Sequence, residues 1–219
     1  MRIRADEGSR EVVFAGPAGR LEGLHELPEV EVRGAAVVCH PHPLHEGTMR
    51  NTIVYRMARA LRSAGLATLR FNFRGVEGSE GEHDGQGGEE GDVAAALDLL
   101  EERHPGRPFW AAGYSFGSRT VCGLAVRDTR IRRLILIALP IEAYDCHCLE
   151  EAPQPGLIVL GSGDSFGTLT ELARRFPHLP ERFETEEITG ADHFFRGRTP
   201  ILEETVRDYA RRMGENGRR

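Results

Sequence analysis

Short apolar runs of strand length recur along this 219-residue sequence, and longer amphipathic segments separate them. The runs at 35–39, 134–138 and 157–161 are apolar without interruption, which is typical of strands buried on both faces of a parallel sheet. Consecutive parallel strands need crossover connections, which helices usually supply. The alternation therefore predicts an α/β fold with a mostly parallel central sheet and helices on both of its faces.

The other predicted elements fit the same alternation. Strands are expected at 66–71, 108–114 and 182–188, and helices at 51–64, 93–103, 118–126, 168–176 and 201–213. The first two strands, 11–15 and 20–27, are separated by the turn residues 16–19 and predict an antiparallel hairpin. Because no linker or internal repeat divides the chain, we expect a single domain over residues 1–219.

The charged residues exclude several classes of function. All 28 basic residues are arginine, which rules out a Schiff-base lysine and P-loop phosphoryl transfer. The balance of 28 basic against 34 acidic residues gives a net charge of −6, which argues against a nucleic-acid partner. No apolar run approaches the roughly 20 residues of a membrane span, and the first residues lack the apolar core of a secretory signal. We therefore expect a cytoplasmic protein, whose four cysteines are free thiols.

The string Gly113-Tyr114-Ser115-Phe116-Gly117 carries the strongest chemical signal. It lies between a predicted strand and a predicted helix, the context in which a G-x-S-x-G turn lifts a serine above the edge of a sheet. A side chain at either glycine would crowd the neighbouring backbone. The string predicts a nucleophilic serine, Ser115.

A serine nucleophile needs a histidine base and a carboxylate that orients it, in the chain order Ser, Asp or Glu, His. His193 follows the last predicted strand and is the best candidate for the base. Asp164 follows the strand at 157–161, at the edge where open α/β sheets build their sites, and is the predicted acid. Asp145, after the preceding strand, and Asp192, beside the base, remain as alternatives.

An acyl-transfer site also needs N–H donors for the developing oxyanion. The Phe116 N–H is expected to be one of them. In the string His40-Pro41-His42-Pro43-Leu44 the prolines lack an N–H, so His42 or Leu44 must supply the other, and we favour His42.

Two histidine-containing strings raise the possibility of a metal. The histidines of 40–45 lie in a turn that its prolines already explain, and Cys146-His147-Cys148 provides half a zinc site at most. No metal and no cofactor are therefore predicted.

Four strings together resemble the small, lidless bacterial members of the α/β-hydrolase superfamily. They are CHPHPLH at 39–45, RFNFRG at 70–75, GYSFG at 113–117 and ADHFF at 191–195. The resemblance covers about residues 37–201. It implies an α/β-hydrolase fold without a lid domain, a Ser115-Asp164-His193 triad, and a position near the site for the loop 72–75.

The sequence departs from this family's usual pattern at a few positions. Glu46 and Glu77 stand where the family often has glycine, and Ser165-Phe166-Gly167 follows Asp164 where an apolar β-branched pair is more usual. Arg74 is open to two interpretations, as a residue that binds an anionic part of the substrate or as one half of a salt bridge within the loop.

The most specific prediction is a serine hydrolase that cleaves a carboxylic ester or thioester through an acyl-enzyme. The connection 138–156 is short where larger relatives insert a helical lid, so a shallow pocket for a small or short-chain acyl group is expected. Two alternatives stay open: an acyltransferase with the same triad, and a binding protein whose catalysis is vestigial.

Overall fold

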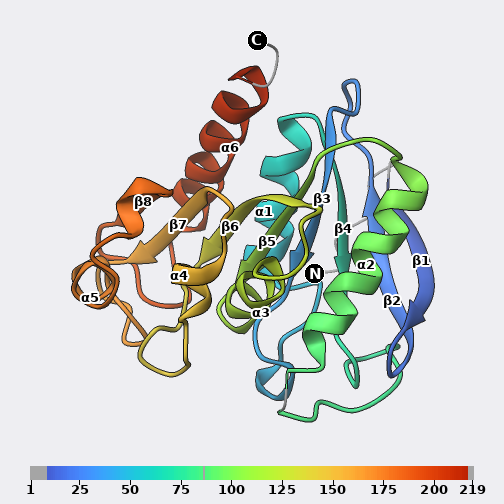
Figure 1. Cartoon of the computed structure of the whole chain (residues 1–219), viewed down its shortest axis with the longest axis horizontal. Coiled ribbons are helices and arrows are strands. Elements are labelled where there is room, and N and C mark those ends of the chain that lie inside the picture. Colours follow the sequence, from blue (N-terminus) through green and yellow to red (C-terminus); the bar gives the residue numbers. More distant parts are fainter. Residues whose placement is uncertain (1–8, 86, 217–219) are drawn as a thin grey trace.

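The computed structural model describes residues 9–85 and 87–216 of the chain. Within these residues, eight strands form one sheet in the order β1-β2-β4-β3-β5-β6-β7-β8 (Figure 1). The strands are β1 (Ser9–Gly16), β2 (Gly19–Glu26), β3 (Gly34–Cys39), β4 (Leu66–Phe71), β5 (Phe109–Tyr114), β6 (Ile131–Ile137), β7 (Gly156–Gly161) and β8 (Phe183–Ile188). β2 pairs antiparallel with β1 and with β4, and all the remaining pairs are parallel. The predicted parallel sheet with an antiparallel N-terminal hairpin is confirmed.

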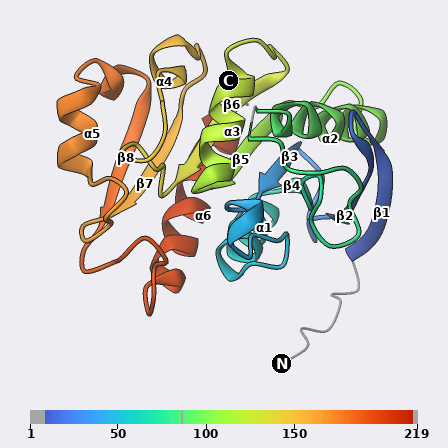
Figure 2. The same ribbon diagram turned by 90° about the horizontal axis from the view of Figure 1, so that it is seen from below.

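Helices cover both faces of the sheet. They are α1 (Thr52–Ser63), α2 (Glu89–Arg103), α3 (Phe116–Ala125), α4 (Cys148–Glu151), α5 (Leu169–Arg175) and α6 (Thr199–Asn216), with short 3-10 turns η1 (Pro43–His45) and η2 (Leu179–Glu181). Figure 2 shows α1 and α6 on one side of the sheet, with α2 and α3 on the other. In the described residues, no helix combines the length and the apolar character that crossing a membrane requires.

The protein has two hydrophobic cores, one on each face of the sheet, because side chains along a strand alternate between the two faces. In β3, Ala35 and Val37 pack into the cluster that includes residues of α2 and α3. Ala36 and Val38, which point to the opposite face, join the cluster formed with α1 and α6. A strand buried on both faces reads as a continuous apolar run, which is why β3 could be predicted from sequence.

Helix α2 begins at Glu89, four residues before the predicted start at 93. Its first turn is charged and yet buried, because the carboxylates have partners from other segments. Asp92 accepts hydrogen bonds from Arg74, and Glu90 forms an ion pair with Arg119. A prediction that starts helices at apolar residues misses such a turn.

Glu46 and Glu77 adopt the left-handed backbone that glycine favours, with φ of 58° and 47°. The Glu77 carboxylate accepts a hydrogen bond of 2.8 Å from the Asn72 amide, a contact that glycine cannot make. This contact offsets part of the backbone strain at Glu77.

The connection between β6 and β7 contains the single-turn helix α4 and no larger insertion. A lid domain is therefore absent from this part of the fold, as predicted. All four cysteines lack disulfide bonds.

Candidate active site

Ser115 occupies the sharp turn between β5 and α3. Its backbone has φ of 52° and ψ of −117°, a conformation that costs strain in a residue with a side chain. The turn also brings backbones into close approach: a Cβ atom at Gly113 would lie 2.2 Å from the Gly117 carbonyl, and one at Gly117 would lie 2.5 Å from the His40 carbonyl oxygen. Both positions therefore require glycine, because any side chain there would collide with the neighbouring backbone.

The structure brings the three residues of the predicted triad together. His193 Nε2 lies 2.9 Å from Ser115 Oγ. On the other side of the ring, His193 Nδ1 lies 2.9 and 3.0 Å from the two carboxylate oxygens of Asp164, which is 3% exposed. A buried carboxylate next to Nδ1 favours the tautomer that leaves Nε2 free to accept the serine proton.

The two alternative acids lie elsewhere. Asp192 is bonded to Arg196 at 2.9 Å and to the backbone N–H of Phe194, and in the described structure its carboxylate is not hydrogen-bonded to the ring of His193. Asp145 is exposed and accepts the His147 N–H at 2.9 Å. Of the three carboxylates, only Asp164 reaches His193.

Two hydrogen bonds, which could not be predicted from the sequence, hold the loops that carry His193 and Asp164 in position. The Tyr114 hydroxyl donates a 3.1 Å hydrogen bond to the His193 carbonyl, which ties the histidine loop to the strand before Ser115. The Gly163 N–H donates to the Ala191 carbonyl at 2.9 Å, which joins the acid loop to the histidine loop. Both depend on segments that meet only in the folded chain.

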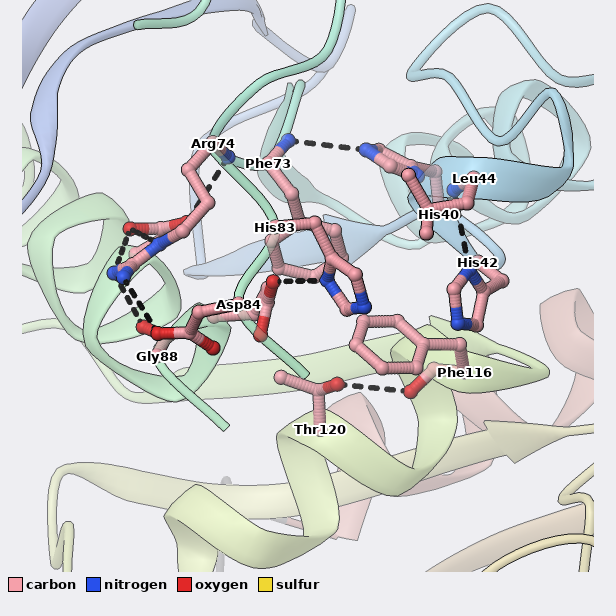
Figure 3. Close-up of polar contacts among 12 residues, drawn as sticks. His40, His42, Leu44, Phe73, Arg74, His83, Asp84, Gly88, Phe116 and Thr120 are labelled. Carbon is pink, nitrogen blue, oxygen red and sulfur yellow. Dashed lines mark hydrogen bonds and ion pairs between the residues drawn. The ribbon is translucent and has the colours of Figure 1, made fainter. Parts of the chain in front are cut away.

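The proposed oxyanion donors, Phe116 and His42, lie side by side with their rings 5.0 Å apart. Among the residues that the structure describes, neither backbone N–H donates a hydrogen bond. The Leu44 N–H, the alternative donor, is occupied, because it donates to His42 Nδ1 at 3.1 Å (Figure 3). His42 thus remains the better candidate for the second donor.

His40 is a positioning residue that joins two of the recognised motifs. Its Nε2 accepts the Phe73 N–H at 3.0 Å, and its Nδ1 lies 2.6 Å from the Pro41 carbonyl oxygen, which accepts the Nδ1–H (Figure 3). Burial of the ring lowers the pKa of His40 to about 4 and keeps it neutral. Both ring nitrogens are therefore hydrogen-bonded to backbone groups, and the bond to the Phe73 N–H holds the loop 72–75 beside the site.

Neither histidine-containing string forms a metal cluster. In the part of the chain that the structure describes, no group of three or more His, Cys, Asp or Glu side chains is arranged to hold a metal ion. His147 is exposed and pairs with Glu150 at 3.0 Å, whereas Cys146 is buried.

Arg74 forms a salt bridge, which was one of the two roles considered for it from the sequence. Its guanidinium is buried, lies 2.7 Å from a carboxylate oxygen of Asp92 and donates to the Gly88 carbonyl. Figure 3 shows this side chain directed toward Gly88 and Asp84, on the far side of His83 from Phe116. It is committed to holding the loop against α2.

Two kinds of surface lie near Ser115 and His193. Two exposed rings pack against His193: the ring centroids of Phe166 and Phe194 lie 4.5 and 5.5 Å from its own. Phe116, which follows Ser115 in the chain, lines a cavity of about 560 Å³, whose walls also include His42. Its volume falls in the range of small-molecule sites.

A serine raised on a strand-to-helix turn of a mostly parallel sheet, with a histidine and a buried carboxylate beside it, is the arrangement of the α/β hydrolases. The family model described as an alpha/beta hydrolase domain matches residues 36–214. The chain therefore belongs to the α/β-hydrolase family, and the protein is a hydrolase by class.

Relatives match the chain over nearly its whole length. An uncharacterised protein of Rickettsia prowazekii is 35% identical over 210 residues, which are 91% of this chain and 87% of that protein. The structure of a protein of unknown function from Agrobacterium tumefaciens is 36% identical, with a TM-score of 0.87 over 95% of this chain and 98% of that one. A member of the α/β serine hydrolases without a lid, from Xanthomonas campestris, is 28% identical, with a TM-score of 0.86 over 97% of this chain and 98% of that one. The resemblance to small lidless α/β hydrolases is confirmed.

Proposed function

We propose that this protein is a serine hydrolase that cleaves carboxylic esters or thioesters of small or short-chain acyl groups. The observation that carries the proposal is the position of His193, whose Nε2 lies 2.9 Å from Ser115 Oγ while its Nδ1 lies 2.9 Å from the buried Asp164. A serine hydroxyl is a weak nucleophile unless a base accepts its proton. This contact provides that base.

In the proposed reaction, Ser115 Oγ attacks the carbonyl carbon of the substrate as His193 Nε2 takes the hydroxyl proton. Asp164 keeps the ring oriented and stabilises the imidazolium that forms. The N–H groups of Phe116 and His42 receive the oxyanion of the tetrahedral intermediate. His193 then donates its proton to the leaving oxygen or sulfur, the bond to the leaving group breaks, and an acyl-Ser115 ester remains. Water, activated by the same histidine, releases the acid and restores the serine.

Covalent labelling with a fluorophosphonate probe tests the proposal without knowledge of the substrate. The probe is expected to modify the wild-type protein at Ser115, because it reacts with an activated serine. Ser115→Ala should abolish labelling, whereas the matched control Ser165→Ala, at an exposed serine near the site, should not. An unlabelled wild-type protein would refute an activated nucleophile and favour a vestigial site.

The shape of the site predicts a preference for short acyl chains. Acetyl to butyryl p-nitrophenyl esters are expected to show higher kcat/KM than esters with more than about ten acyl carbons. Each buried methylene contributes ~0.8 kcal/mol, and without a lid the distal methylenes of a long chain stay in water. Measuring kcat/KM along an acyl series checks this, and a steady rise with chain length would contradict it.

A further inference from the structure

The cavity beside Phe116 contains a second histidine–carboxylate pair, which the proposed mechanism does not use. His83 Nδ1 is hydrogen-bonded to Glu89 Oε1 at the start of α2. Glu89 is 1% exposed, and its second oxygen, Oε2, is buried with no hydrogen-bond partner among the described residues. A buried carboxylate oxygen without a donor is costly, because the oxygen has lost its hydrogen bonds to water.

This pair resembles the His193–Asp164 pair in chemistry. In a neutral imidazole, a carboxylate bonded at Nδ1 keeps the proton on that nitrogen, so that Nε2 is a hydrogen-bond acceptor. His83 Nε2 makes no hydrogen bond with the described residues. A substrate hydroxyl that donates to this nitrogen would complete its bonding.

The pair lies close to the proposed oxyanion donors. The His83 ring centroid is 4.9 Å from that of His42 and 5.7 Å from that of Phe116, and all three residues line the cavity. Figure 3 shows the three rings gathered together, with His83 directed toward Phe116. A group bound at His83 would therefore lie beside Phe116, whose backbone N–H is one of the proposed oxyanion donors.

The charges of the cavity select against an anionic ligand. Its walls hold three carboxylates and two guanidinium groups: Glu89, Glu90, Asp145, Arg119 and Arg127. Both arginines are already paired with Glu90. These five groups together carry one more negative than positive charge, which disfavours a carboxylate or phosphate.

A neutral group with several hydroxyls fits these walls better. Its hydroxyls can donate to His83 Nε2 and to the carboxylates, and its carbon skeleton can lie against the rings of Phe116 and Tyr144, which also line the cavity. In simple esters such hydroxyls belong to the alcohol portion, whereas the acyl chain is apolar and suits the exposed rings of Phe166 and Phe194.

We propose that the cavity at His83 and Glu89 binds a neutral, polyhydroxylated alcohol portion of the ester, such as a glycerol or sugar unit, with His83 Nε2 accepting a hydroxyl hydrogen bond. This inference rests on the proposed function, because it names the leaving group of the Ser115 reaction. His83 and Glu89 are then specificity-determining residues.

The test compares two acetate esters of the same shape, glycerol 1-monoacetate and 2-methylbutyl acetate, in which methyl groups replace the two hydroxyls. The wild-type kcat/KM is expected to be at least about tenfold higher for the glycerol ester, because the apolar ester leaves buried polar groups unpaired. His83→Phe should reduce this ratio about tenfold. The matched control His178→Phe, at an exposed histidine outside the cavity, should keep the wild-type ratio.

The outcomes separate the two proposals. A wild-type ratio near one, or one that His83→Phe leaves unchanged, overturns the role of the cavity while the esterase activity stands. Faster hydrolysis of acetylcholine than of the glycerol ester also overturns it, since the carboxylates would then recognise a cation. Labelling of Ser115 without hydrolysis of the glycerol ester overturns the cavity assignment alone. Absence of both labelling and hydrolysis overturns the proposed function and this inference with it.

Discussion

Ser115→Ala is expected to lower turnover of an activated short-chain ester by roughly 10⁴-fold or more. In the proposed mechanism this hydroxyl forms the covalent intermediate, which alanine cannot form. The fold should be retained, because the side chain of Ser115 bonds only to His193 in the described structure, whereas its backbone carries the contacts of the turn. Steady-state kinetics, with far-UV circular dichroism of both proteins, measure the two effects.

The neighbouring Ser118→Ala provides a contrast for this experiment. Ser118 Oγ donates to the Ser115 carbonyl at 2.6 Å and is not hydrogen-bonded to His193 in the described structure, so its loss should affect stability more than turnover. If Ser115→Ala retained turnover near the wild-type value, another residue would be the nucleophile, and the proposed mechanism would be wrong.

The sheet could be predicted because the sequences of its buried central strands are almost entirely apolar. β3, β5 and β7 are buried at every position and are apolar throughout, apart from glycines. The start of α2 could not be predicted in the same way, because Asp92 is buried only by virtue of its pairing with Arg74, 18 residues earlier. The local pattern of apolar residues predicts which segments are buried. It does not predict which distant charged residue will pair with a buried carboxylate.

The same distinction applies to the candidate site. Ser115 lies in a G-x-S-x-G turn after a predicted strand, and His193 follows the last predicted strand in the expected chain order. Both residues could therefore be predicted from the sequence. Tyr114, His40 and His83 give no such signal. Each acts through a partner that the fold brings near: the His193 carbonyl, the Phe73 N–H and the Glu89 carboxylate, respectively.

Asp164→Asn is expected to reduce turnover by on the order of 10²- to 10⁴-fold with little change in the fold. Asp164 Oδ1 accepts the Phe166 N–H at 2.8 Å, and Oδ2 lies 2.9 Å from His193 Nδ1. In an asparagine, the oxygen must remain at the Oδ1 position to accept the Phe166 N–H, so the amide nitrogen takes the place of Oδ2. That nitrogen donates to an unprotonated His193 Nδ1 and so favours the tautomer with the proton on Nε2, although the oxygen at Oδ1 stays 3.0 Å from Nδ1. A protonated Nε2 cannot accept the proton of Ser115.

The two alternative acids supply the controls. Asp192→Asn should cost far less than Asp164→Asn, because the half-buried Asp192 is bonded to Arg196 rather than to the ring of His193. Asp145→Asn should also cost far less, since the Asp145 carboxylate bonds to the His147 N–H and lies on another loop. Measurement of kcat for the three variants, together with their thermal unfolding, compares the three carboxylates directly. If Asp145→Asn abolished activity while Asp164→Asn stayed near wild type, the acid would come from the loop after β6. The bond between Asp164 and His193 would then have only a structural role, because the orienting carboxylate must be the one whose removal changes the tautomer of the base.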